Sequence, residues 1–132
     1  MNRRGYLRYL PLVIATLLVV GCSRSVPLQN IEEQRIITQS PLSLDTVKTA
    51  IIKGGQTVGW RMTVVKPNQI LASLDVRKHQ LVVDIVYDPD KYSIVYRDST
   101  NLNYKGTNIH PNYRRWIDKL NREIQRALPI SN

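Results

Sequence analysis

The chain has 132 residues, a formal net charge of +9 and 42% hydrophobic residues, which is the size and composition of one globular domain. Its single cysteine excludes an internal disulfide framework and zinc modules built from several cysteines. With 22% charged residues and ordinary levels of glycine and proline, the composition is typical neither of a disordered chain nor of a fibrous repeat.

The first 22 residues have the pattern of an export signal. Arg3, Arg4 and Arg8 give a positively charged start, and an apolar run follows over residues 12–20. A basic segment, a short apolar core and a small residue before the cleavage point are the features of a secretory signal peptide. A transmembrane anchor is the alternative, but the run is shorter than the about 20 apolar residues that a spanning helix needs.

The apolar run ends in Val19-Val20-Gly21-Cys22, with the only cysteine of the chain in the last position. This ending resembles the lipobox of bacterial lipoproteins, in which an aliphatic residue, a small or aliphatic residue and Gly or Ala precede a cysteine. The resemblance covers the first 22 residues. It implies cleavage after Gly21, a diacylglyceryl thioether on Cys22 and acylation of the new amino group.

The residue after the cysteine indicates the membrane to which a lipoprotein is sorted. Lipoproteins of this kind that stay in the inner membrane usually carry Asp there, whereas this chain has Ser23. For a Gram-negative source, the resemblance therefore implies a protein at the periplasmic face of the outer membrane. Several acyl chains together would hold it firmly, because each buried methylene adds about 0.8 kcal/mol.

The exported chain would remain basic. Removal of residues 1–21 takes away three of the 19 basic side chains and none of the 10 acidic ones. A basic balance points to nucleic acid or to an anionic surface, and export disfavours nucleic acid. The expected partners are the membrane itself through the lipid anchor, and an envelope protein, a glycan or the anionic headgroups of lipids. A solvated basic surface without a specific ligand is the alternative.

Residues 22–42 are expected to contain the lipidated cysteine and a tether. This segment is polar and mixed, with two prolines and no aromatic residue. Ile31, Ile36 and Ile37 leave room for a short strand or a partner-binding segment. The folded domain is then expected over residues 43–128, followed by a tail over residues 129–132.

The domain is expected to begin with an amphipathic helix. Ser43 can cap it, and its apolar residues recur on one face. The pair Gly54-Gly55 is expected to end it, because glycine is common just past a helix.

Four strand-like runs follow, over residues 60–65, 69–76 and 80–87 and from residue 92 to residue 97. Apolar residues alternate with others along these runs, and short connections between them imply antiparallel neighbours. One face of the sheet is therefore expected to be apolar, whereas the other combines valines with polar residues.

The last helix is the clearest element. Apolar residues recur at steps of three and four from Tyr113 to Leu128, with Pro111 suited to its first turn and Pro129 to its end. The expected fold class is α+β, a four-stranded antiparallel sheet with two helices packed on one face, in the order α-β-β-β-β-α.

Two surfaces contain candidate partner-binding residues. The connection over residues 99–112 is longer than the usual connection of about 4–6 residues and is rich in asparagine, which suits glycans or peptide backbone. An alternative is that its asparagines close turns and its apolar residues hold it against the sheet. The last helix has a basic face. The candidates are Asn101, Asn103, Tyr104 and His110 in the connection and Arg115, Arg122 and Arg126 on the helix.

Catalysis is not expected. Asp98, Ser99 and His110 include the residue types of a hydrolytic triad, but Ser99 lacks the flanking glycines of a nucleophile elbow. His79 and His110 have no further ligands at metal-site spacing, so neither a metal nor another cofactor is expected. The expected function is a lipid-anchored, non-catalytic binding or accessory module. An enzyme acting on envelope glycans and a purely structural envelope protein are the alternatives.

Overall fold

Four consecutive strands make up most of the sheet. They are β3 (Arg61–Lys66), β4 (Gln69–Val76), β5 (His79–Tyr87) and β6 (Lys91–Thr100). In this computed structural model, which describes residues 24–129, each strand is antiparallel to the next. Alternate residues of β4 and β5 are buried on one face, and the opposite face is partly exposed. The prediction of an antiparallel sheet in an α+β fold is confirmed.

The sheet has a fifth strand, so the prediction of four is wrong. β2 (Ile31–Arg35) pairs with β6, which gives the strand order β2-β6-β5-β4-β3. Alternation is interrupted in β2, because its pairing register shifts between Ile31 and Gln34 and Glu33 has a φ of 54°. This irregular edge strand therefore lacks the two-residue period from which strands are predicted.

The element order also differs from the predicted one. β1 (Val26–Pro27) and β2 precede the first helix, and β7 (Asn108–Ile109) lies between β6 and the last helix. β1 and β7 pair with each other in a separate two-stranded sheet. Two strands thus lie inside the segment that was predicted to be a tether, and the folded part begins well before residue 43.

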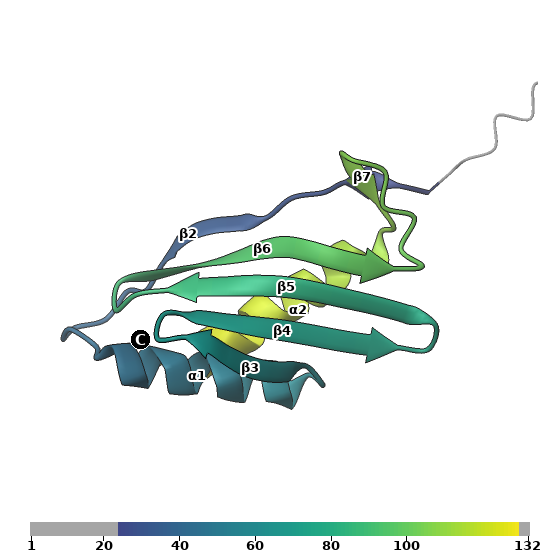
Figure 1. Cartoon of the computed structure of the whole chain (residues 1–132). Coiled ribbons are helices and arrows are strands. Elements are labelled where there is room, and N and C mark those ends of the chain that lie inside the picture. Colours follow the sequence, from purple (N-terminus) through teal and green to yellow (C-terminus); the bar gives the residue numbers. More distant parts are fainter. Residues whose placement is uncertain (1–23, 130–132) are drawn as a thin grey trace, which may run out of the picture.

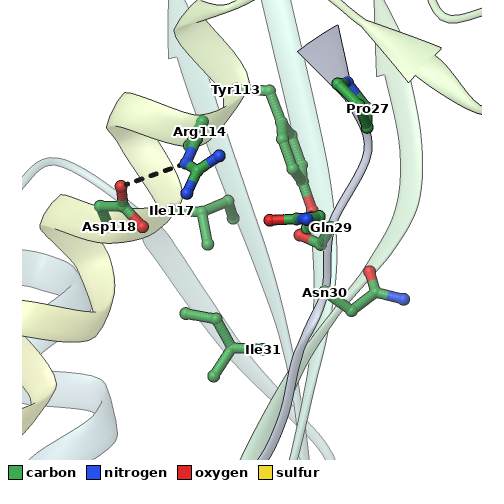
Figure 2. A pocket seen from close by; sticks show the side chains of 8 residues that line it. All are labelled: Pro27, Gln29, Asn30, Ile31, Tyr113, Arg114, Ile117 and Asp118. Carbon is green, nitrogen blue, oxygen red and sulfur yellow. Dashed lines mark hydrogen bonds and ion pairs between the residues drawn. The ribbon is translucent and has the colours of Figure 1, made fainter.

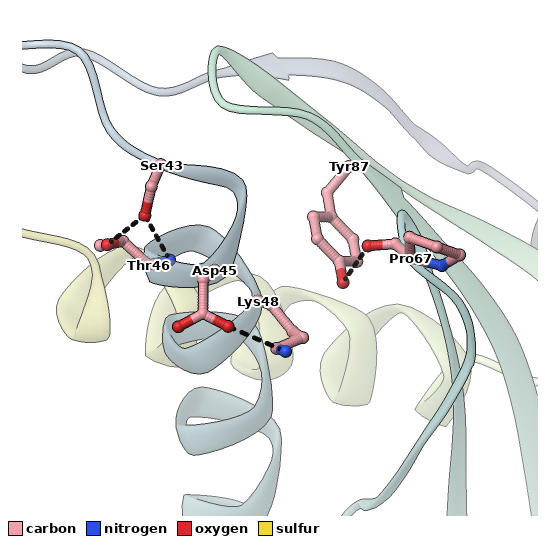
Figure 3. Close-up of polar contacts among 6 residues, drawn as sticks. All are labelled: Ser43, Asp45, Thr46, Lys48, Pro67 and Tyr87. Atoms are coloured by element: carbon pink, nitrogen blue, oxygen red, sulfur yellow. Dashed lines mark hydrogen bonds and ion pairs between the residues drawn. The ribbon is translucent and has the colours of Figure 1, made fainter.

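The first helix, α1 (Leu44–Thr57), begins at a side-chain cap (Figure 3). Ser43 Oγ accepts a hydrogen bond from the backbone N–H of Thr46 at 3.0 Å, which satisfies a donor that the helix itself leaves unpaired. In the first turn, Asp45 forms an ion pair with Lys48 at 2.9 Å. The hydrogen bond and the charge of Asp45 raise the pKa of Lys48.

The two glycines of α1 do not end the helix, so that prediction is wrong. A Cβ at Gly54 would lie 2.7 Å from the Cα of Ile124 in α2 (Asn112–Ala127), and a Cβ at Gly55 would overlap Met62. The glycines therefore allow close contacts with neighbouring elements, and α1 continues to Thr57. Both helices lie against the same face of the sheet (Figure 1).

The core between the sheet and the helices contains three tyrosines with paired hydroxyls. Tyr92 Oη donates to Asn121 Oδ1 and accepts a hydrogen bond from Gln125 Nε2 at 3.0 Å. Tyr87 Oη donates to the carbonyl of Pro67 at 3.0 Å (Figure 3). Burial raises the pKa of Tyr92 and of the third, Tyr113, to about 12. Burial therefore makes ionisation of these phenols less favourable in the folded state.

The segment between β1 and β2 packs across the first turns of α2 (Figure 2). Tyr113 Oη donates to the carbonyl of Gln29 at 3.3 Å, and Asn30 Oδ1 accepts the backbone N–H of Tyr96 at 2.9 Å. A pocket of about 70 Å³ remains between the segment and the helix, with room for about two water molecules. This contact makes the amino-terminal segment an integral part of the fold.

Candidate functional site

The predicted lipidation site, Cys22, and the predicted cleavage site after Gly21 lie outside the described residues. The described residues begin at Arg24, two residues after Cys22 and two residues before β1. β1 and β7 lie at one end of the sheet, together with the turn between β4 and β5 and the first turn of α2 (Figure 1). We call this the β7 end. The chain enters the fold there.

Asn101 connects two segments of the β7 end. Its backbone φ is 58°, a left-handed conformation that asparagine tolerates better than most residues. Its side-chain Nδ2 donates to the carbonyl of Lys78 at 2.7 Å, and its own carbonyl accepts from His79 Nδ1 at 2.7 Å. The side chain of this candidate residue is therefore engaged within the fold, where it ties the connection to the β4–β5 turn.

Tyr104 and His110 differ in what they offer a partner. Tyr104 is 44% exposed, and its ring stacks on that of Tyr96 with centroids 4.6 Å apart. His110 Nδ1 accepts the backbone N–H of Asn112 at 3.1 Å at the start of α2. Tyr104 therefore presents an aromatic surface to solvent, whereas one ring nitrogen of His110 serves the helix terminus.

The three residues of the conceivable triad make other contacts. Asp98 Oδ1 accepts the backbone N–H of Ser99 at 2.8 Å, and Ser99 Oγ shares a hydrogen bond with Tyr96 Oη at 2.8 Å. His110 Nδ1 accepts a hydrogen bond from the backbone at the start of α2. Within residues 24–129 no hydrogen bond joins the side chains of Asp98, Ser99 and His110 to one another, so the arrangement provides no proton relay.

The basic face of α2 forms an exposed stripe. Its members follow each other at helical spacing and are Arg115, Lys119, Arg122 and Arg126. Arg126 pairs with Glu123 at 2.6 Å. For the other three, no carboxylate among the described residues lies within the 4.0 Å ion-pair distance. The stripe can therefore attract an anionic partner.

A polar pocket of about 420 Å³ opens at the β7 end. Its lining residues are Arg24, Ser25, Asn103, Lys105 and Asn108. Two cations, two amides and a hydroxyl can donate hydrogen bonds to an anion such as a phosphate. The sequence singled out Asn103 but missed Arg24, because only the pairing of β1 with β7 brings residue 24 beside the 101–107 connection.

A smaller pocket of about 160 Å³ lies between the two helices and the sheet. Its apolar lining includes Trp60 and Trp116, and Lys119 of the basic stripe lies at its side. Trp60 is 3% exposed and belongs to the core, whereas Trp116 is half-buried at the core edge. The two tryptophans therefore contribute to packing.

Comparisons of the chain with protein-family models, with curated proteins and with solved structures give no match. Within residues 24–129, no group of three or more His, Cys, Asp or Glu side chains is arranged to hold a metal ion. The helices of this part of the chain are too short or too polar to span a bilayer. A functional proposal therefore depends on the chain's own motif and surfaces.

Proposed function

We propose that this protein is a lipoprotein of the bacterial envelope, held by an acylated Cys22 at the periplasmic face of the outer membrane. The observation that carries the proposal is the Val19-Val20-Gly21-Cys22 motif, which follows an apolar run and contains the only cysteine of the chain. Cysteine supplies a soft, alkylatable sulfur, and the apolar run would hold that sulfur at the membrane surface during modification.

The way the chain enters the fold supports an anchor at this position. β1 begins at Val26, so residues 23–25 are all that separate Cys22 from the first strand. An extended chain covers roughly 3.3–3.6 Å per residue, so the path from Cys22 to Val26 is at most about 14 Å. An acylated Cys22 would therefore hold the β7 end close to the lipid headgroups.

We further propose that the domain is a non-catalytic binding or accessory module. The polar atoms of Asp98, Ser99 and His110 make hydrogen bonds that serve local structure. Exposed groups suited to a partner lie instead on the connection, at Tyr104, and along the stripe of α2. An envelope protein with an acidic surface, a glycan and anionic lipid headgroups all match these groups chemically.

The anchor is tested by Cys22→Ser in Gram-negative cells supplied with labelled palmitate. We expect the wild-type chain to incorporate label, to lose residues 1–21 and to fractionate with the outer membrane. The variant should take up no label and keep residues 1–21, because it lacks the sulfur. Mass spectrometry and membrane fractionation measure both effects, and Ser23→Ala is a control that keeps the cysteine.

The outcome that contradicts the anchor is a Cys22→Ser product with the same mass and the same fractionation as the wild type. A separate variant tests the sorting to the outer membrane. Ser23→Asp should leave the lipid in place and move the protein to the inner membrane. Recovery of a lipidated Ser23→Asp protein in the outer membrane would overturn the proposed sorting while leaving the anchor intact.

The binding role is tested by a photo-crosslinking amino acid in place of Tyr104, introduced in living cells. A discrete crosslinked product is expected, because this side chain lies on the proposed partner-binding surface and its 44% exposure makes it accessible. The control position is Val86, which is 42% exposed on the opposite face of the sheet and should give no such product. A ladder of products that is the same from both positions would indicate a structural protein without a specific partner.

A further inference from the structure

We propose that the β7 end binds the phosphate groups of anionic phospholipids in the leaflet that holds Cys22, so that the anchored domain docks on the membrane in one orientation. This inference rests on the lipid anchor proposed above and adds a membrane-binding surface to it. The surface consists of exposed cations on segments that are far apart in the sequence and meet at this end of the fold.

Unpaired positive charge gathers at the β7 end. The cations concerned are all exposed and are Arg24, Arg77, Lys78, Lys105 and Arg115. For none of them does an ion pair occur among residues 24–129. Two nearby carboxylates, Asp75 and Asp118, are paired with Arg61 and Arg114, which leaves Asp98 as the unpaired acid of this end. Positive charge therefore predominates there.

The opposite end of the sheet has no such excess. It comprises β2, the start of α1 and the β3–β4 and β5–β6 turns (Figure 1). The last turns of α2 lie there too, because Asn121 and Gln125 make hydrogen bonds to Tyr92 beside the β5–β6 turn. Acids and cations balance at this end: the acids are Glu32, Glu33, Asp45, Asp88, Asp90 and Glu123, and the cations are Arg35, Lys48, Lys66, Lys91, Arg122 and Arg126. Asp45 pairs with Lys48 and Glu33 with Lys91. Charge is thus polarised along the sheet, and an anionic surface would attract the β7 end.

The polar pocket gives this end a place for a phosphate. Arg24, which comes before β1, and Lys105, which comes before β7, both line it, together with two asparagines and a serine. No acidic side chain among the described residues lines it. Arg24 is two residues from the proposed lipidated cysteine, so the pocket would lie at the depth of neighbouring headgroups. Charge-assisted hydrogen bonds from Arg and Lys are the usual means of holding phosphate oxygens.

An aromatic side chain accompanies the cations. Tyr104 precedes Lys105 and is 44% exposed, with its ring supported by Tyr96. Tyrosine is favoured at the boundary between lipid and water, because its ring is apolar and its hydroxyl is polar. The cations and this tyrosine therefore match the chemistry of a headgroup layer better than that of a neutral glycan.

The anchor makes weak docking sufficient. Each Lys or Arg near an anionic membrane strengthens binding about fivefold, and a short covalent link keeps the two surfaces at an effective concentration of about millimolar. Screening acts over about 8 Å at physiological salt, so docking should be lost when the ionic strength is raised.

The test uses the purified, lipidated protein in vesicles of phosphatidylcholine alone or of phosphatidylcholine with phosphatidylglycerol. Hydrogen–deuterium exchange is followed at the β4–β5 turn and at residues 103–108. With phosphatidylglycerol we expect exchange at both places to slow about fivefold or more, and high salt to remove the effect. The variant Arg24→Glu/Arg77→Glu/Lys105→Glu should lose this slowing.

The matched control is Arg35→Glu/Lys53→Glu/Lys66→Glu, which changes the net charge equally with exposed residues away from the β7 end and outside the basic stripe of α2. It should retain the slowing. Equal exchange in both vesicles, or equal loss in both variants, would overturn the docking surface while the mass of the lipidated protein still supports the anchor. Equal slowing by inorganic phosphate in detergent would assign the pocket to free phosphate and overturn membrane docking. If the purified protein carries no lipid on Cys22, both the proposed anchor and this inference are overturned.

Discussion

Gly54→Ala is expected to lower the free energy of unfolding by about 2–3 kcal/mol, the usual effect of forcing extra atoms into a packed contact. The new Cβ would lie 2.7 Å from both N and Cα of Ile124. These are backbone atoms of α2, so the steric clash can be relieved only if the two helices move apart. At an exposed helical position the same substitution would raise stability by about 1 kcal/mol, so the contact reverses the sign.

The matched control for this prediction is the adjacent glycine. A Cβ at Gly55 meets the Sδ, Cε and Cγ atoms of Met62, the outer part of a flexible side chain. Gly55→Ala should therefore change stability by less than about 1 kcal/mol. Urea denaturation followed by tryptophan fluorescence measures both variants. Equal effects of the two substitutions would show that the close approach of α1 and α2 does not limit stability.

The glycines also illustrate what the sequence can and cannot predict. Two adjacent glycines near the end of an apolar pattern indicate a helix terminus, because local preferences are all that a short window contains. Gly54 lacks a side chain because the backbone of Ile124, in the other helix, leaves no room for a Cβ at this position. By contrast, the four strands β3 to β6 and the helix α2 have regular apolar periods and short turns, and the sequence predicts them.

The amino-terminal strands could not be predicted in the same way. β1 has two residues, and β2 is an edge strand with an interrupted register. Their partners, β7 and β6, follow much later in the chain. The same long-range pairing brings Arg24 beside Lys105. The candidate residues Asn103 and Tyr104 were found from composition, whereas the cluster of cations around them depends on the fold.

The second large effect expected is a loss of stability as pH rises from about 10 to about 12. Burial raises the pKa of Tyr92 and Tyr113 from 10.0 to about 12 in the folded chain. The folded state thus holds these protons more tightly than the unfolded state does. The resulting stabilisation is fully present below the unfolded pKa of 10.0 and disappears as pH rises through about 12.

The size of this effect follows from the shift. One pKa unit corresponds to about 1.4 kcal/mol, so each of the two tyrosines contributes roughly 2–3 kcal/mol that alkaline pH removes. Tyr92 and Tyr113 are each 1% exposed, so solvent screens their phenolates poorly. Unfolding free energies measured by urea denaturation between pH 8 and pH 12 test the expected decline.

Tyr92→Phe/Tyr113→Phe separates the ionisation of these two phenols from other effects of alkaline pH. At neutral pH the double variant should be less stable by about 1–3 kcal/mol, because Asn121 and Gln125 lose a buried partner. Above pH 10 its stability should decline less steeply than that of the wild type, since the two tyrosines whose pKa values burial raises most are gone. Tyr104→Phe, which removes a hydroxyl at an exposed site, is measured beside it as the control. Equal slopes in all three proteins would place the alkaline sensitivity elsewhere and contradict a role for these two buried hydroxyls.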